Sequence, residues 1–209
     1  MVPFVITIGR ELGSGGKTIG NILSEKLGVP VYDRTLIRLA AKESGISEDT
    51  FNKIDEISDH GLFSFLIRPF ASPFGSLSAF YSNSMSNESL FKLQTEIIEE
   101  KARTENCIIV GRCSDYILRN HPRHLNVFIR ANMDDRIKLL CDREIIGKDS
   151  AEQQIRNIDK KRAEYHDFYC ETTWGDSRSY DLCVNSSLLG LEKTAEFILQ
   201  YAKEVLKID

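Results

Sequence analysis

The segment VITIGRELGSGGKT, residues 5–18, decides the fold. The apolar run 3–8 is rich in β-branched side chains, which indicates a short buried strand. A glycine-rich turn follows, and Gly16-Lys17-Thr18 then opens an amphipathic helix that ends before Gly28. A strand, a glycine-rich turn and a helix that begins with Gly-Lys-Thr form the pattern of a phosphate-binding loop.

The pattern gives the turn a definite chemistry. Small residues let successive backbone N–H groups face a phosphate, and the start of the helix adds unpaired donors and the positive end of its dipole. Lys17 is expected to neutralise charge on the β- and γ-phosphates, and the Thr18 hydroxyl is expected to ligate Mg²⁺. The residues expected to hold the nucleotide are Gly13, Ser14, Gly15, Gly16, Lys17 and Thr18.

One position departs from the pattern. The first glycine of the motif should stand at position 11, where this chain has Glu11. A carboxylate beside phosphates repels them unless it is paired or points away, and Arg10 is its neighbouring cation in the sequence. A glycine-rich turn that binds no ligand is the alternative interpretation of the segment.

The rest of the chain alternates short apolar runs with helical patterns. The further strands are predicted at residues 29–32, 107–110, 126–129 and 180–184, and the further helices at 88–103, 134–146, 151–168 and 190–206. About five buried strands separated by helices require a parallel sheet with helices on both faces. The sequence therefore predicts an α/β fold.

Composition narrows the class of protein. The 209 residues suffice for one hydrophobic core, and the net charge of −4 argues against general nucleic-acid binding. The five cysteines form no C-x-x-C pair, so we expect neither a zinc site nor a disulfide framework, and a cytoplasmic location fits best. No signal peptide and no apolar run of about 20 residues is visible, so no membrane contact is expected.

Two stretches allow more than one interpretation. Residues 59–87 hold five of the eleven phenylalanines among many serines, and this insertion could be core, an oligomer contact or an apolar acceptor pocket. Residues 52–55 spell N-K-x-D, the guanine-reading motif of GTPases. That motif should follow a late strand, whereas here it lies within an amphipathic helical pattern, and the chain contains no D-x-x-G. We interpret it as a solvated helix face.

The segments ITIGRELGSGGKT at 6–18, VYDR at 31–34 and IIVGR at 108–112 together resemble the cytidylate kinase-like family of nucleoside monophosphate kinases. The segment DLCVNSS at 181–187 is similar to the last strand and following loop of cytidylate kinases. The resemblance implies a three-layer P-loop kinase fold in a single domain, residues 1–209. It also implies that a helical lid occupies about residues 145–170.

The resemblance also implies an acceptor site. Asp33 matches an aspartate that touches the monophosphate, and Gly111 with Arg112 match the start of a Gly-Arg-Asp motif in which Cys113 replaces the acid. Arg112 follows a predicted strand, at the sheet edge where α/β proteins bind ligands. The residues expected to bind the acceptor are Asp33, Arg38, Gly111, Arg112 and Asp115, the last as a substitute for the missing acid.

The expected activity is ATP- and Mg²⁺-dependent phosphoryl transfer to a nucleoside monophosphate, with cytidylate as the default acceptor. Lys17, Arg112, Lys161 and Arg162 are expected to stabilise charge on the transferring group. Two alternatives stay open. One is a nucleotide-binding or regulatory protein with weak or no transfer, suggested by Glu11 and Cys113. The other is a kinase for a different small molecule, suggested by the insertion.

Overall fold

The computed structural model describes residues 2–33 and 87–208. The chain divides into two compact units, one made of residues 1–35 and 98–209 and the other of residues 36–97. The first unit contains the phosphate-loop segment. Arg38, the N-K-x-D motif and nearly all of the insertion at 59–87 lie outside the described residues.

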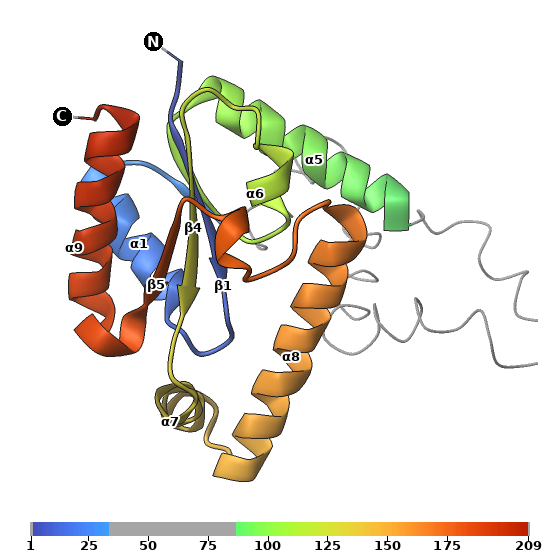
Figure 1. The fold of residues 1–209 in the computed structure, drawn as a ribbon, viewed down its shortest axis with the longest axis vertical. Helices are drawn as coiled ribbons and strands as arrows, with labels where there is room; N and C mark the ends of the chain where they lie inside the picture. The colour runs from blue at the N-terminus through green and yellow to red at the C-terminus, as the bar shows by residue number, and fades with distance from the viewer. Residues whose placement is uncertain (1, 34–86, 209) are drawn as a thin grey trace, which may run out of the picture. The chain divides into compact units, whose positions relative to one another are not determined.

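A five-stranded parallel sheet forms the middle layer of the first unit (Figure 1). The strands are β1 (Val5–Arg10), β2 (Val31–Tyr32), β3 (Cys107–Val110), β4 (His124–Arg130) and β5 (Leu182–Asn185). Their order is β2-β3-β1-β4-β5, and every neighbouring pair is parallel. The predicted parallel sheet of about five strands is thereby confirmed.

Helices α1 (Gly16–Leu27) and α9 (Ser186–Leu206) cover one face of the sheet. Their apolar residues recur at helical spacing, so each helix presents a continuous stripe to the strands. Ile19 and Leu23 of α1 meet Ala195 and Ile198 of α9 in the main core, together with the inward side chains of β1, β3 and β4. Burial of this stripe is what fixes the start of α1 against the end of β1.

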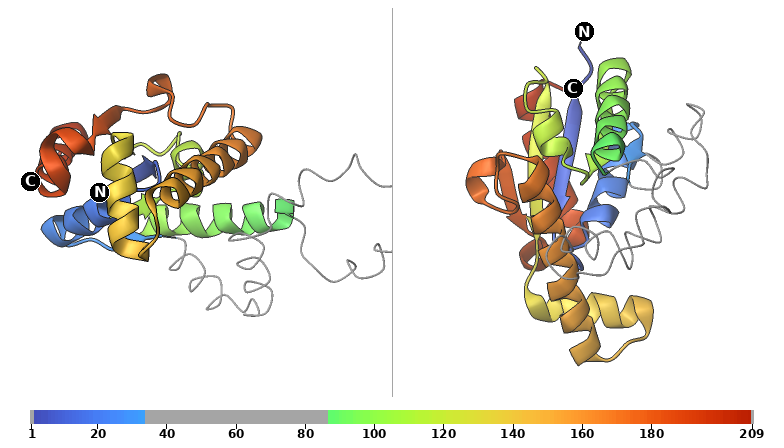
Figure 2. Two further views of the ribbon diagram at one scale, coloured as in Figure 1. Left: turned by 90° about the horizontal axis from the view of Figure 1, so that it is seen from below. Right: turned by 90° about the vertical axis from the view of Figure 1, so that its right-hand side faces the viewer.

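The opposite face carries α6 (Ser114–Ile117) and the end of α8 (Lys148–Tyr169), and a 3₁₀ turn, η2 (Ser177–Ser179), precedes β5 (Figure 2). Helix α5 (Asn87–Thr104) crosses the boundary between the two units, and its later turns bury Ile98 and Ala102. No helix among the described residues is both long and apolar enough to cross a membrane.

Helix α7 (Met133–Glu144) lies beyond the carboxyl end of β4 and packs against the first half of α8 (Figure 1). These two helices share a small separate core made of Leu140, Ala151 and Ile155, and Leu12 of the glycine-rich turn packs against it. The turn therefore lies between the main core behind α1 and this second core.

Candidate active site

The turn between β1 and α1 has the backbone shape that a phosphate cradle needs. Gly13 and Gly15 have φ values of 79° and 76°, in the left-handed region that favours glycine. A Cβ atom at Gly13 would stand 2.9 Å from the Arg136 carbonyl oxygen. Gly15 precedes α1 and forms no side-chain cap bond, so the first amides of α1 stay available to an anion.

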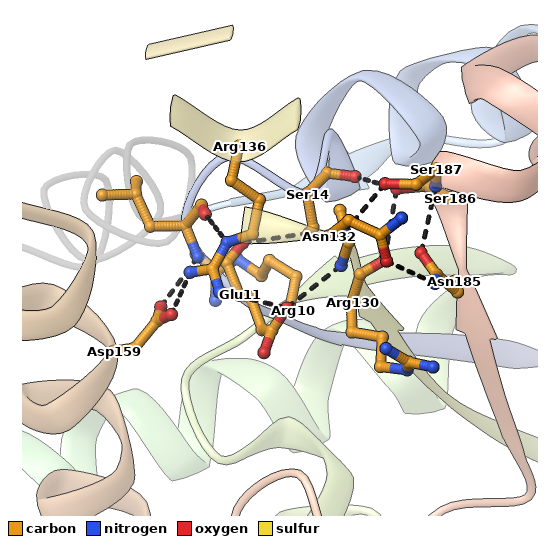
Figure 3. Close-up of polar contacts among 12 residues, drawn as sticks. Arg10, Glu11, Ser14, Arg130, Asn132, Arg136, Asp159, Asn185, Ser186 and Ser187 are labelled. Atoms are coloured by element: carbon orange, nitrogen blue, oxygen red, sulfur yellow. Dashed lines mark hydrogen bonds and ion pairs between the residues drawn. The ribbon is translucent and has the colours of Figure 1, made fainter. Parts of the chain in front are cut away.

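Glu11 points away from this cradle. Its Oε2 accepts a hydrogen bond from the Ala131 amide at 3.0 Å and lies 3.3 Å from an Arg136 guanidinium nitrogen (Figure 3). The cation that pairs with Glu11 is Arg136, 125 positions later in the sequence, and not its sequence neighbour Arg10. The carboxylate thus anchors the turn instead of repelling a phosphate.

Arg136 is the centre of this anchor. Its side chain is 5% exposed, its Nε donates to the Leu12 carbonyl at 2.7 Å, and its guanidinium pairs with both Glu11 and Asp159. Asp159 of α8 in turn accepts from the Leu12 amide at 2.8 Å. The C=O and N–H groups of Leu12 are therefore both hydrogen-bonded, to Arg136 of α7 and Asp159 of α8 respectively. The charge pattern of those helices did not predict this arrangement.

The junction of β5 and α9 supports the turn from the other side (Figure 3). The Ser186 hydroxyl donates to the Ser14 carbonyl at 2.8 Å and also lies 3.2 Å from the Arg130 carbonyl. The Ser14 hydroxyl donates to the Glu11 carbonyl at 2.9 Å. These bonds occupy the carbonyl oxygens of Glu11 and Ser14, which are therefore directed into the protein.

Lys17 and Asp33 come together beside the turn. The Lys17 Nζ atom lies 2.8 Å from the Asp33 carboxylate, with the lysine side chain 68% and the aspartate side chain 16% exposed. Thr18 is exposed on the same first turn of α1. The sequence placed Lys17 with the donor phosphates and Asp33 with the acceptor, and the structure joins these two predicted sites through one ion pair.

Three arginines gather at the carboxyl ends of β1 and β3. The Arg10 guanidinium covers Gly111, where a Cβ atom would collide with it, and Arg162 of α8 donates to the Arg10 carbonyl at 3.0 Å. Burial, with the nearby charges of Arg162 and Arg112, lowers the pKa of Arg10 to about 9 although Asp33 opposes the shift. Burial also lowers the pKa of Arg162. This is a concentration of desolvated positive charge.

The loop that carries Arg112 is strained. Gly111, Arg112 and Cys113 have φ values of 74°, 67° and 55°, so three successive residues adopt the left-handed conformation. Non-glycine residues in this region cost of the order of 1–3 kcal/mol each and concentrate at functional sites. No pattern in the sequence predicts this strain, because only the first of the three residues is a glycine.

Other predicted site residues have different surroundings. Asp115 is 8% exposed, and its Oδ2 lies 2.6 Å from the His166 Nε2 atom of α8. Asp115 is therefore bonded to His166 in the structure and does not face the arginine cluster as a free carboxylate. Along α8, Arg156 pairs with Glu152 and Lys160 with Glu164, each one helical turn away. Of the two α8 cations expected to stabilise the transferring group, Arg162 donates to the Arg10 carbonyl at the end of β1, and Lys161 is half-buried.

Sequence reasoning missed three residues that shape the site, namely Arg10, Arg136 and Asp159. The sequence suggests Arg10 only as a partner for Glu11. Arg136 and Asp159 lie in helices dense in charge, where a buried ion cannot be told from a solvated one by pattern alone. The one signal for Arg136 was Glu11 itself, since a carboxylate at that position requires a cation, and no signal pointed to Asp159.

Proteins similar in sequence match almost the whole length of this chain. A cytidylate kinase of Methanobrevibacter smithii is 26% identical over 203 residues, which are 96% of this chain and 99% of the relative. A cytidylate kinase of Archaeoglobus fulgidus is 28% identical over 209 residues, covering 97% of this chain and 96% of the relative. The sequence model of the cytidylate kinase-like family matches residues 5–188.

Solved structures support the fold. An uncharacterized protein from Eubacterium ventriosum superimposes with a TM-score of 0.70 at 27% identity, covering 96% of this chain and 98% of that one. A shikimate kinase from Bacteroides thetaiotaomicron gives a TM-score of 0.55 at 17% identity, covering 98% and 99%, which indicates a shared P-loop kinase fold. The chain therefore belongs to the cytidylate kinase-like family and is a phosphotransferase.

Proposed function

We propose that the protein transfers the γ-phosphoryl group of ATP to a nucleoside monophosphate, and that cytidylate is the acceptor to test first. The observation that carries the proposal is the cluster of Arg10, Arg112 and Arg162 beside the Lys17–Asp33 pair. Guanidinium groups bind phosphate oxygens in bidentate fashion, and burial strengthens that attraction. An acceptor phosphate would offset the mutual repulsion of these cations.

The donor half of the site rests on the turn and on α1. Backbone amides of residues 13–18 would surround the β-phosphate, and Lys17 would offset charge on the transferring group. The exposed Thr18 hydroxyl would ligate Mg²⁺ when the ion binds with ATP, and the ion would supply positive charge beside the phosphates. The side chains fit both groups, because the one carboxylate within the turn is turned away and neutralised.

The acceptor half would use Asp33 and the arginine cluster. Nucleotide binding to Lys17 would release Asp33 from its ion pair, which leaves the carboxylate able to contact the acceptor. We also propose that α8, which occupies the predicted lid range, contributes Arg162 and Lys161 to the transferring phosphate. Catalysis would then consist of positioning and charge stabilisation, without a covalent intermediate.

The regulatory alternative retains one observation in its favour, namely Cys113 at the position of the motif acid, with Asp115 bonded to His166 instead of facing a ligand. Glu11 gives this alternative less support, because its carboxylate is paired with Arg136. A kinase for another small molecule is the third candidate, suggested by the Phe-rich insertion at 59–87, nearly all of which lies outside the described residues.

One assay separates the three. Purified protein is given ATP and Mg²⁺ with cytidylate, other nucleoside monophosphates and phosphate-free acceptors, while product formation and ATP affinity are measured. Turnover of a monophosphate supports the proposal, ATP binding without turnover supports the regulatory alternative, and turnover of a phosphate-free acceptor supports the third.

Two pairs of variants sharpen the assay. Lys17→Ala should abolish turnover, whereas Lys26→Ala, at the other end of α1 and paired with Glu196 at 3.5 Å, should not. Arg112→Gln should raise the KM of the acceptor more than that of ATP, whereas Arg119→Gln, which removes an exposed side chain stacked on Tyr116, should leave both unchanged. Unaltered ATP affinity and activity in Lys17→Ala would refute the assignment of the cradle.

A further inference from the structure

A second cluster of reactive side chains lies where α6 begins and α8 ends. Cys113 is the residue before α6, and Cys170 is the residue after α8, where its amide donates to the His166 carbonyl at 2.8 Å. The 2.6 Å contact between Asp115 and His166 joins the two helices within a few residues of both thiols. The Cys113 and Cys170 side chains are hydrogen-bonded to each other, and both residues are buried, with 4% and 7% exposure.

The proposed transfer reaction uses none of these four side chains. Buried cysteines are often inert packing residues, but here each thiol has a polar partner. Cys183 is exposed and Cys141 half-buried, and neither is part of this cluster. The thiol pair thus has an imidazole and a carboxylate beside it, and a protonated histidine beside a thiol favours the thiolate.

We propose that Cys113 and Cys170 form a reversible disulfide when the protein meets a peroxide, and that this bond fixes the Arg112 loop to the end of α8. The two thiols interact with each other and lie on either side of the Asp115–His166 contact, so both belong to one buried cluster, and the disulfide requires the sulfur atoms to approach to about 2.05 Å. Since Cys113 follows Arg112 directly, the bond would restrain the loop that carries the proposed acceptor ligand.

The chemistry balances with hydrogen peroxide as the oxidant. The Cys170 thiolate attacks one peroxide oxygen, the O–O bond breaks, and the hydroxide that leaves takes up a proton to become water. The Cys113 sulfur then attacks the sulfenic sulfur of Cys170, and the Cys113 proton departs with the hydroxyl group as a second water. Two thiols and one peroxide give one disulfide and two waters, and a small dithiol reverses the change.

The roles of the two cysteines follow from their surroundings. The hydrogen bond from the Cys113 thiol lowers the pKa of Cys170, with His166 adding to the effect against the opposing influence of burial. The same bond and burial raise the pKa of Cys113. Asp115 of α6 also lies near Cys170 and disfavours its thiolate, while Tyr180 before β5 faces it as a neutral phenol whose pKa is raised by burial and by Asp115, with a smaller effect of Cys170. Cys170 is thus the attacking thiolate, and Cys113 resolves the sulfenic acid.

The test uses the full chain, hydrogen peroxide and a denaturing alkylation quench. Trypsin places Cys113 in the peptide 113–119 and Cys170 in the peptide 163–178, each with a single cysteine. We expect these two peptides to appear joined, two hydrogen atoms lighter than their sum, and to separate after dithiothreitol. Cys183→Ser should give the same product, whereas Cys170→Ser should not form it and Cys113→Ser should stop at oxidised Cys170.

A second variant tests the part played by His166. His166→Gln should slow formation of the joined peptide, whereas His121→Gln should not, with both variants checked for native circular dichroism. Joined peptides at the wild-type rate in His166→Gln would overturn the assigned roles of the cysteines. The absence of the 113–119 to 163–178 product, while exposed Cys183 is oxidised, would overturn the disulfide itself.

The consequence for the acceptor loop rests on the proposed function and is measured separately. Oxidised wild-type protein should lose turnover with the monophosphate acceptor and recover it with dithiothreitol, whereas Cys113→Ser should keep its turnover after the same treatment. If oxidised protein with the joined peptides turns over normally, the restraint on the Arg112 loop is refuted. If the reduced protein has no activity with any acceptor, the proposed function fails, while the peptide product still decides the thiol pair.

Discussion

At the scale of single residues, Arg136 is the side chain on which the turn depends most. It neutralises Glu11 and Asp159 and donates to the Leu12 carbonyl, all while 5% exposed. Removing one member of a buried ionic group leaves the others uncompensated, which costs about 3–5 kcal/mol. The same guanidinium, placed on the surface of α7, would contribute little.

We therefore expect Arg136→Met to lower the free energy of unfolding by about 3–5 kcal/mol, measured by urea denaturation. The matched control is Arg143→Met on the same helix, where the side chain is 57% exposed and pairs with Glu144. Surface pairs of that kind are worth about 0–1 kcal/mol. Equal losses in the two variants would show that Arg136 does not anchor the turn.

At the scale of residues, the sequence predicted the shape of the glycine-rich turn but not the side chains that hold it in place. Small residues followed by Lys17 and Thr18 have one well-known structural context, so the shape of the turn could be predicted from the motif. The partners of Glu11 and Leu12 could not, because Arg136 and Asp159 lie in helices whose charges all look solvated until the chain is folded.

At the scale of elements, the β1–α1 turn combines two separate demands on one glycine. Gly13 needs a left-handed backbone and also passes so close to α7 that a side chain would meet the Arg136 carbonyl at 2.9 Å. Gly28, at the end of α1, has a φ of 66° but no atom within 4 Å of its missing Cβ. A comparison of substitutions at Gly13 and Gly28 therefore separates the cost of a left-handed backbone from the cost of a collision.

Gly13→Ala should therefore cost more stability than Gly28→Ala, and it should also weaken ATP binding. A left-handed alanine costs about 1–2 kcal/mol, which is the whole effect expected at Gly28, and the collision adds to it at Gly13. Gly147→Ala, with ordinary backbone angles and open space, should be near neutral. Thermal denaturation with and without ATP measures all three, and a loss at Gly13 no larger than at Gly28 would contradict the collision.

The elements themselves were predicted to within a few residues, with two kinds of exception. The short helix α6 and the turn η2 were missed, because segments of three or four residues carry no periodicity. Helix α9 was expected to start at Gly190 but starts at Ser186, and Gly190, with a φ of 75°, marks a kink inside it. A glycine near a helix end is ambiguous in sequence, since it can precede the helix or interrupt it.

At the scale of the whole molecule, a half-buried histidine in β4 sets one limit of stability. His124 lies in β4, with its Nε2 atom 2.7 Å from the Thr7 hydroxyl, which itself donates to Asn126. Burial lowers the pKa of His124 to about 4, although Asp181 opposes the shift. The folded protein therefore keeps this ring neutral at pH values at which the unfolded chain, with a pKa near 6.5, already binds a proton.

The sign of the pH effect follows from the depressed pKa. Stability from His124 is complete above about pH 6.5 and is lost as the pH falls towards 4, by about 2–3 kcal/mol at 1.4 kcal/mol per pKa unit. Urea unfolding between pH 6.5 and 4 should show this decline in the wild type and a shallower one in His124→Gln. His121→Gln should keep the wild-type slope, and equal slopes in all three would refute the assignment.

The layered architecture could be predicted from alternating strands and helices, since a parallel sheet buried on both faces is the arrangement that such a pattern allows. The three-dimensional grouping of Arg10, Arg112 and Arg162 could not, because it depends on the order of β1 and β3 in the sheet and on where α8 lies. The resemblance to the family implies that Arg112 binds the acceptor, and the structure shows that Arg10 lies near Arg112.

The anchoring of the turn has a consequence for the order of events in folding. The sequence of the turn ends at Thr18, yet the groups that hydrogen-bond to it come from much later in the chain. The Ala131 amide, the Arg136 guanidinium, the Asp159 carboxylate and the Ser186 hydroxyl lie 120, 124, 147 and 172 residues beyond their partners in the turn. Contacts so distant along the chain are entropically expensive and form slowly. During synthesis, the turn therefore leaves the ribosome well before the residues that hold it, and a nucleotide finds a complete binding site only after the start of α9 has emerged.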